Sequence, residues 1–184
     1  MRIAGSIITL ICGIVVVVGV FLLAWMNMCE QSWLGYQCLA SSGWDMTSLK
    51  AIFADEGISS YMLASLGYNI DMYGVYLVLG GGALMAVCAL PAFIVSLATK
   101  GGKAAVLTLS ILAIVGALVA IGGCVWYIIS ALDVIELTSL GGSFLGIDSD
   151  CTIYYGFYIT AAAAVLGLVF AILTAAFAKG KQDW

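Results

Sequence analysis

Four long apolar stretches dominate this chain, and none of them contains an Asp, Glu, Lys or Arg. A helix needs roughly 20 apolar residues to cross about 30 Å of hydrocarbon, and each stretch is long enough. Only 9 % of the residues are charged and 64 % are hydrophobic, so lipid must cover much of the surface. The sequence therefore predicts a single integral membrane domain over 1–184, an all-α bundle of four transmembrane helices at about 3–25, 74–98, 104–129 and 156–178.

Charges are sorted by sign into alternate gaps between these spans. Five of the six basic residues lie at the N-terminus, between the second and third spans, and in the C-terminal tail: Arg2, Lys100, Lys103, Lys179 and Lys181. Nine of the ten acids lie in a large outer loop over 26–73 and a smaller one over 130–155. Basic residues near span ends stay in the cytoplasm. We therefore expect both termini in the cytoplasm and the acidic loops outside a plasma or cell membrane.

The six cysteines fall into two groups. Cys12 and Cys88 lie in the middle of spans, where a lone cysteine is usually a small packing residue. The other four lie outside or at the outer edge, and they are the disulfide candidates: Cys29, Cys38, Cys124 and Cys151. Four cysteines allow three pairings. One joins Cys29 to Cys38 and Cys124 to Cys151, and the crossed alternatives connect the two loops.

An outer compartment is oxidising, so structural disulfides are the first expectation for these four cysteines. Thiol–disulfide catalysis is the sharper alternative, but it requires a close redox pair of the C-x-x-C type. Every cysteine spacing in this chain is larger than that.

Residues that carry most enzyme chemistry are missing. The chain has no His, the commonest general base and metal ligand, and no charge within a span. Asp148 and Asp150 are expected to be solvated loop acids, although such a pair can bind a hard cation. We expect no catalytic residue, no cofactor, no metal site and, with six scattered basic residues, no nucleic-acid partner.

Small residues recur along the spans and predict where helices pack, because lipid supplies no hydrophobic force between helices and close approach must replace it. The packing candidates are Gly82, Ala86, Gly116, Ala120 and Ala164. Packing within the chain is the simpler interpretation, and homo-oligomerisation is the alternative.

Aromatic residues form two sets. One lies near the outer ends of the spans, where amphipathic rings prefer the membrane interface: Trp25, Tyr73, Tyr76, Trp126, Tyr127, Tyr154, Tyr155 and Tyr158. The other lies in the large outer loop and supplies the candidates for contact with a partner protein: Trp33, Tyr36, Trp44 and Phe53. Within the same loop, apolar residues at helical spacing predict a short amphipathic helix over 48–54.

The layout resembles that of the claudin and peripheral-myelin-protein group of four-span proteins. The shared features are the short inner turn, the smaller second outer loop, and a large first outer loop that carries Cys29 and Cys38. The resemblance is one of topology, because the family's Trp and Gly-Leu-Trp motif does not precede Cys29. It implies a small extracellular sheet in the first loop and a role in lateral and cell-to-cell contacts.

These observations favour a non-enzymatic membrane scaffold or interaction protein that acts through disulfide-braced outer loops and lateral helix packing. Its partners would be the lipid bilayer and either other membrane proteins or further copies of itself. The alternatives are an accessory subunit of a larger membrane complex and an oligomeric channel or passive transporter. A thiol-redox membrane enzyme is the least favoured.

Overall fold

The computed structural model describes residues 2–32, 35–44, 73–98, 102–145 and 149–179. Within these residues, four helices and three strands follow one another. They are α1 (Arg2–Leu22), β1 (Ala24–Ser32), β2 (Gly35–Ser42), α4 (Tyr73–Ala98), α5 (Lys103–Leu145), β3 (Ser149–Ile153) and α6 (Tyr155–Lys179).

The prediction of a multi-pass membrane protein with four spans is confirmed at the level of helix length and composition. Within the described residues, four helical segments are long and apolar enough to cross a membrane, over Ile3–Leu22, Tyr73–Ala98, Lys103–Leu132 and Tyr155–Ala178. The first span ends earlier than the expected limit at Trp25, because Ala24 and Trp25 already belong to β1. The membrane part is entirely helical, and strands occur only beyond it.

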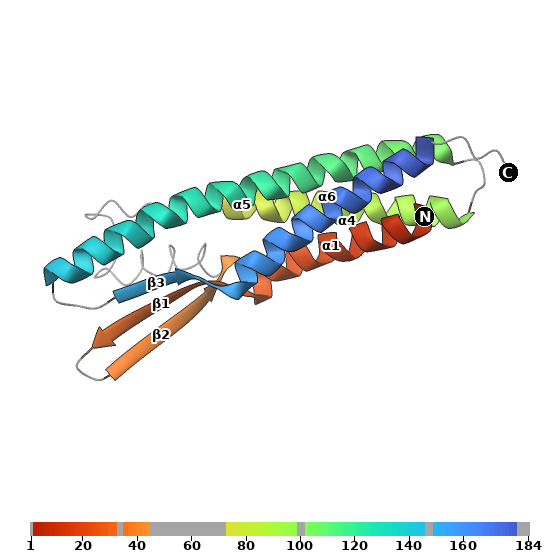
Figure 1. Cartoon of the computed structure of the whole chain (residues 1–184). Coiled ribbons are helices and arrows are strands. Elements are labelled where there is room, and N and C mark those ends of the chain that lie inside the picture. The colour runs from red at the N-terminus through yellow and green to blue at the C-terminus, as the bar shows by residue number, and fades with distance from the viewer. Residues whose placement is uncertain (1, 33–34, 45–72, 99–101, 146–148, 180–184) are drawn as a thin grey trace.

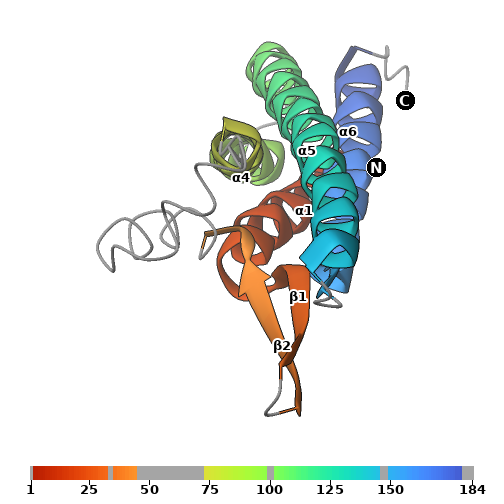
Figure 2. The same ribbon diagram turned by 90° about the vertical axis from the view of Figure 1, so that its left-hand side faces the viewer.

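The four helices form a ring of antiparallel neighbours. Both α1 and α5 pack against α4 and α6, while α1 and α5 hardly meet. Figure 1 shows that the start of α1 and the end of α6 lie at one end of the bundle, and the sheet lies toward the other. Viewed from the sheet end in Figure 2, the strands project away from the bundle beside α1.

Segments that follow α1 and α5 build one antiparallel sheet in the order β2-β1-β3. The central strand β1 pairs with β2 from Ala24 opposite Ser42 to Ser32 opposite Gly35, with a register shift between Ala24 and Met26. Its other edge pairs with β3, from Met26 opposite Ile153 to Glu30 opposite Ser149. The segment between α5 and α6 therefore completes a sheet that the segment after α1 begins.

The expected outer loop over 130–155 is wrong in its first half, because α5 continues as a helix to Leu145. Asp133 and Glu136 mark where the apolar span ends, but a helix satisfies its own backbone hydrogen bonds in water as well as in lipid. The segment also lacks proline and repeats apolar residues at helical spacing. The charges therefore indicated the limit of the span and not the end of the helix.

Contacts between α1 and α6 recur every seven residues on both helices. Gly5 lies against Thr174, Cys12 against Gly167, and Gly19 against Thr160. Both threonine hydroxyls donate hydrogen bonds of 2.8 Å within α6, from Thr174 to the Phe170 carbonyl and from Thr160 to the Gly156 carbonyl. A repeat of seven keeps two helices in contact along a shallow left-handed crossing.

A second close seam joins α4 to α5 through glycines on both helices. A Cβ added at Gly81 would lie 2.5 Å from the Gly116 carbonyl oxygen and the Ala120 nitrogen. A Cβ at Gly74, seven residues earlier, would lie 2.9 Å from the Gly123 carbonyl oxygen and the Tyr127 nitrogen. Only glycine permits such an approach of two backbones.

The five predicted packing residues all lie within or beside interfaces of the chain itself. Gly116 and Ala120 meet Gly81 on α4, while Gly82 meets Val16 and Ala86 meets Gly13 on α1. Ala164 is fully buried in the core of the bundle. These seams are used for intrachain packing.

Candidate functional site

The candidate site is the three-stranded sheet together with its junction to the bundle, because this is where the described chain forms a defined structure beyond the spans. The junction is centred on Trp25, the second residue of β1, which is 0 % exposed. Its indole nitrogen donates a 2.9 Å hydrogen bond to the carbonyl oxygen of Gly19 in the last turn of α1. The final carbonyls of a helix have no partner within that helix, so the indole supplies one.

Three buried rings from three elements meet at this junction. The ring of Trp25 lies 5.0 Å from that of Tyr127 on α5 and 5.5 Å from that of Phe157 on α6, both nearly edge-on. Tyr127 and Phe157 stack on each other at 5.3 Å with an angle of 27° between their planes. Edge-to-face and offset-stacked arrangements at these separations are the favourable ones.

Backbone contacts hold the strands to the same point. The Tyr154 amide, between β3 and α6, donates a 2.8 Å hydrogen bond to the Trp25 carbonyl oxygen. A Cβ added at Gly43, just after β2, would lie 3.0 Å from the Trp25 ring, and one at Gly156 would lie 2.6 Å from the Leu23 side chain. The end of the sheet that contains Trp25 is therefore packed closely against α1 and α6.

The prediction that Trp25 and Tyr127 anchor the membrane interface is wrong, because both are fully buried in this cluster. The same boundary position can serve either purpose, and only the path of β1 over the bundle turns these rings inward. The remaining six aromatic residues of that set are exposed, as an interfacial position requires: Tyr73, Tyr76, Trp126, Tyr154, Tyr155 and Tyr158.

The sheet brings three of the four disulfide candidates together along the backbone. Cys29 of β1 lies directly opposite Cys38 of β2. On the other edge of β1, Cys151 of β3 lies opposite Met28, and Cys29 lies opposite Asp150. Cys124 is a buried free thiol on α5, as Cys12 and Cys88 are free thiols in the bundle.

The four partner-contact candidates fall in different places. Trp33 and Phe53, with the short helix expected over 48–54, lie outside the described residues. Tyr36 belongs to β2. Trp44 follows β2, is 40 % exposed, and contacts the Phe21 ring at 5.0 Å.

The junction residues were missed as a group when the sequence was read alone. Trp25, Tyr127 and Phe157 are far apart in the chain, and each carries an ordinary boundary aromatic pattern. The one signal was glycine: Gly19, Gly43 and Gly156 all allow close approach near this cluster. Glycines are common throughout the chain, so this signal does not separate the junction from the other seams.

Comparisons with protein-family models, with curated proteins and with solved structures found no match for this chain. Within the described ranges, no three cysteine or acidic residues gather as a metal-binding group would.

Proposed function

We propose that the chain is a non-enzymatic membrane scaffold whose outer sheet, braced by a disulfide, binds another membrane protein or a second copy of the chain. The observation that carries this proposal is the close packing, at Trp25, of a three-stranded sheet against the bundle. Contact surfaces that are held in shape before binding lose less conformational entropy on association. The layout resembling claudins supports the same role, through lateral and cell-to-cell contacts.

The edge strand β2 is the face that we propose for contact. Within the described residues its only strand partner is β1, on one of its two edges. An edge strand presents backbone N–H and C=O groups to which a strand from a partner can add. Exposed Ala40 lies on this strand, and exposed Trp44 follows it.

Photo-crosslinking in intact membranes tests this assignment. A benzophenone amino acid placed at Ala40 of β2 should form a discrete protein adduct that survives purification. The matched control is the same group at Leu118, an exposed position in the middle of α5, which should react with lipid. Protein adducts absent at Ala40 and at exposed Thr152 of β3 would remove the sheet as a contact surface.

The disulfide in this proposal joins Cys29 to Cys38. The two residues lie directly opposite each other in the β1–β2 ladder. Opposed residues of antiparallel strands have Cα atoms about 4.5–5.5 Å apart, within the roughly 4.4–6.8 Å range of disulfides. Peptide mapping without reductant should recover a Cys29–Cys38 linked pair, and a Cys124–Cys151 linked pair would contradict this connectivity.

Orientation is part of the same proposal, with the termini in the cytoplasm and the sheet outside. Arg2, Lys103 and Lys179 lie at helix ends on the side away from the sheet, as the positive-inside rule requires of a cytoplasmic face. A membrane-impermeant amine reagent applied to intact cells should label Lys50 and leave Lys179 and Lys181 unmodified. The reverse pattern would invert the proposed topology.

Lateral packing supports an accessory subunit as a second candidate function. The predicted small-residue seams are used within the chain, but Gly80 on α4 and Gly122 on α5 face open space. A neighbouring helix could approach closely at either glycine. Gly80→Ile and Gly122→Ile should then release a copurifying chain or break up an oligomer in mild detergent, while the monomer remains folded. An unchanged native mass would contradict lateral packing at these two points.

Measurement of solute flux distinguishes a channel from both the scaffold and the accessory subunit. Proteoliposomes that carry the purified chain should show no more ion or small-solute flux than empty liposomes under an imposed gradient. Flux above that background would favour a pore.

A further inference from the structure

Basic residues mark the helix ends on the side of the bundle away from the sheet. There α1 begins at Arg2, α5 begins at Lys103 and α6 ends at Lys179. Lys100 and Lys181 lie within three residues of these helix ends in the sequence. Five of the six basic residues, but only one of the ten acids, therefore lie at or next to these ends along the chain.

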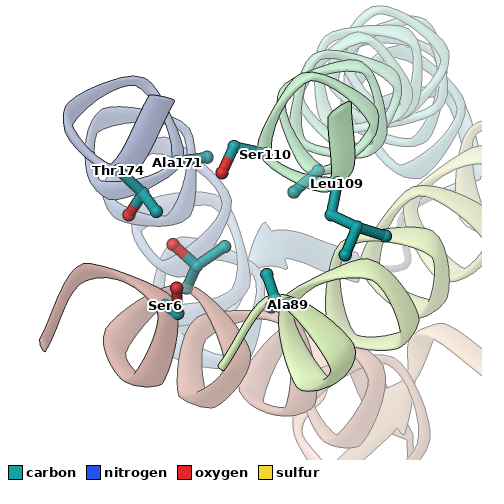
Figure 3. Close-up of a pocket in the computed structure, with 9 residues that line it drawn as sticks. Ser6, Ala89, Leu109, Ser110, Ala171 and Thr174 are labelled. Carbon is teal, nitrogen blue, oxygen red and sulfur yellow. The ribbon is translucent and has the colours of Figure 1, made fainter. Parts of the chain in front are cut away.

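A small cavity between the helices provides a common depth from which the positions of these ends can be compared. Its lining includes one residue with a hydroxyl group from each of three helices: Ser6 of α1, Ser110 of α5 and Thr174 of α6 (Figure 3). Counted from these residues toward the helix ends, Arg2 is four residues away, Lys179 is five and Lys103 is seven. At about 1.5 Å per residue, the three basic residues lie within about 5 Å of one another along the bundle axis.

The order of the helices places these residues side by side as well. Helix α6 lies between the other two, because it packs against both α1 and α5 while those two hardly meet. The axes of packed helices are about 8–10 Å apart. Lys179 at the end of α6 is therefore flanked by Arg2 at the start of α1 and by Lys103 at the start of α5. The fold thus brings together three positive charges from distant parts of the sequence.

No acidic residue of the described helices offsets these charges. Helices α1, α4 and α6 contain no Asp or Glu, and the first acid of α5 is Asp133, beyond the far end of its span. Arg2 directly precedes the span that starts at Ile3, and Lys179 directly follows the span that ends at Ala178. The uncompensated positive charge therefore lies at the edge of the hydrocarbon, at the depth of the lipid headgroups.

Apolar side chains lie just inside the basic residues. Ile3 of α1 is 41 % exposed and Phe177 of α6 is 43 % exposed. The contact of Gly5 with Thr174 places these two side chains at nearly the same depth on neighbouring helices. A phospholipid can therefore cover them with its acyl chains while its phosphate reaches the basic residues, whereas a soluble anion would meet the charges alone.

We propose that this basic cluster, Arg2, Lys103 and Lys179, binds the headgroups of anionic phospholipids. A zwitterionic headgroup carries its own cation beside the phosphate, so an anionic lipid gains more from the attraction. Each Lys or Arg next to an anionic membrane surface changes binding by about fivefold. The positive-inside rule concerns the direction in which a chain inserts. Selection of a lipid by charges gathered at one depth is a separate property, and it does not depend on the scaffold function proposed above.

Native mass spectrometry of the full chain tests the proposal. The chain is released from nanodiscs that contain equal amounts of phosphatidylglycerol and phosphatidylcholine with identical acyl chains. The lipids that stay bound should be at least threefold enriched in phosphatidylglycerol, and an equal ratio of the two lipids would overturn the proposal. Because both leaflets have the same composition, the result does not depend on which way the chain is oriented.

Neutral variants assign the enrichment to the cluster. The triple variant Arg2→Gln, Lys103→Gln and Lys179→Gln keeps polar side chains but removes the charges, so the ratio of bound lipids should fall close to one. Lys50→Gln is the matched control, because Lys50 is the sixth basic residue and lies between β2 and α4 in the sequence. Enrichment that persists in the triple variant, or an equal loss in the control, would overturn the assignment.

Photo-crosslinking of the unmodified chain gives a second test that does not require the triple variant to fold. A phosphatidylglycerol analogue with a diazirine near its headgroup should form at least twofold more adducts at 2–6 and 173–179 than the matching phosphatidylcholine analogue. The opposite end of α6, over 155–160, is the internal comparison, and there the two analogues should react equally. Equal reaction of the two analogues at both ends would overturn the proposal.

Discussion

The indole of Trp25 donates its hydrogen bond to the carbonyl oxygen of Gly19, six residues earlier, and thereby connects the first strand to the last turn of the first helix. The amide of Leu23 reaches the same carbonyl oxygen at 3.3 Å. A carbonyl oxygen has two lone pairs and can accept both. The Gly19 carbonyl, one of the last four of α1, is thus satisfied by two donors where the chain passes from helix to strand.

Replacement of Trp25 separates the hydrogen bond from the ring contacts. Trp25→Phe keeps an aromatic ring against Tyr127 and Phe157 but removes the donor, which should cost about 1 kcal/mol. Trp25→Ala also removes the buried ring and should cost about 3–5 kcal/mol. The measurement is the free energy of unfolding in mixed micelles. Equal losses in the two variants would show that the ring contacts contribute little.

Adjacent glycines on α4 should respond oppositely to the same substitution. Gly81→Ala brings a Cβ to within 2.5 Å of α5 backbone atoms, so the two helices must separate, at about 1–3 kcal/mol. A Cβ at Gly80 meets nothing within 4 Å, and alanine is the better helix former by about 0.5–1 kcal/mol. The midpoint temperature of thermal unfolding should therefore be lower for Gly81→Ala than for the parent. For Gly80→Ala it should equal that of the parent or be higher. A lower midpoint in both variants would contradict the close contact between α4 and α5 at Gly81.

The seam between α1 and α6 predicts a rescue. A Cβ at Gly19 would collide with the Thr160 hydroxyl oxygen, so Gly19→Ala should destabilise the bundle by about 1–3 kcal/mol. Thr160→Ala removes the colliding oxygen, and the double variant should recover part of that loss. A double-mutant cycle on unfolding free energies measures the coupling. Simple additivity of the two single losses would show that these residues are not in direct contact.

Reduction should affect the sheet and leave the bundle cysteines unaffected. If Cys29 and Cys38 are bonded, reductant or the double variant Cys29→Ser with Cys38→Ser should lower the stability of the outer region by about 2–5 kcal/mol. Limited proteolysis between β1 and β2, with and without reductant, reports this change. Cys124→Ala is the control, because that buried thiol is free and its substitution should leave the response to reductant unchanged.

The sequence by itself determined those features that depend only on the residues of one continuous segment. Four spans follow from uninterrupted apolar length, because no other fold of such segments satisfies its backbone in lipid. The sorting of charges and the small-residue positions were equally visible, because both are local properties. A sheet in the first loop was expected only from the resemblance, and its third strand at Ser149–Ile153 was not predicted, since that strand pairs with β1 more than 100 residues away.

Tertiary structure decided which side of each element faces which neighbour. Tyr127 and Trp126 are adjacent aromatics at the same boundary, yet Tyr127 is 0 % exposed and Trp126 is 48 % exposed. The hydroxyls of Ser6, Ser110 and Thr174 look like isolated polar residues in three separate spans, and they line one cavity only because four helices meet there. Periodicity specifies that a segment is a helix, but its rotation and its neighbours are set by close packing, which depends on every other helix at once.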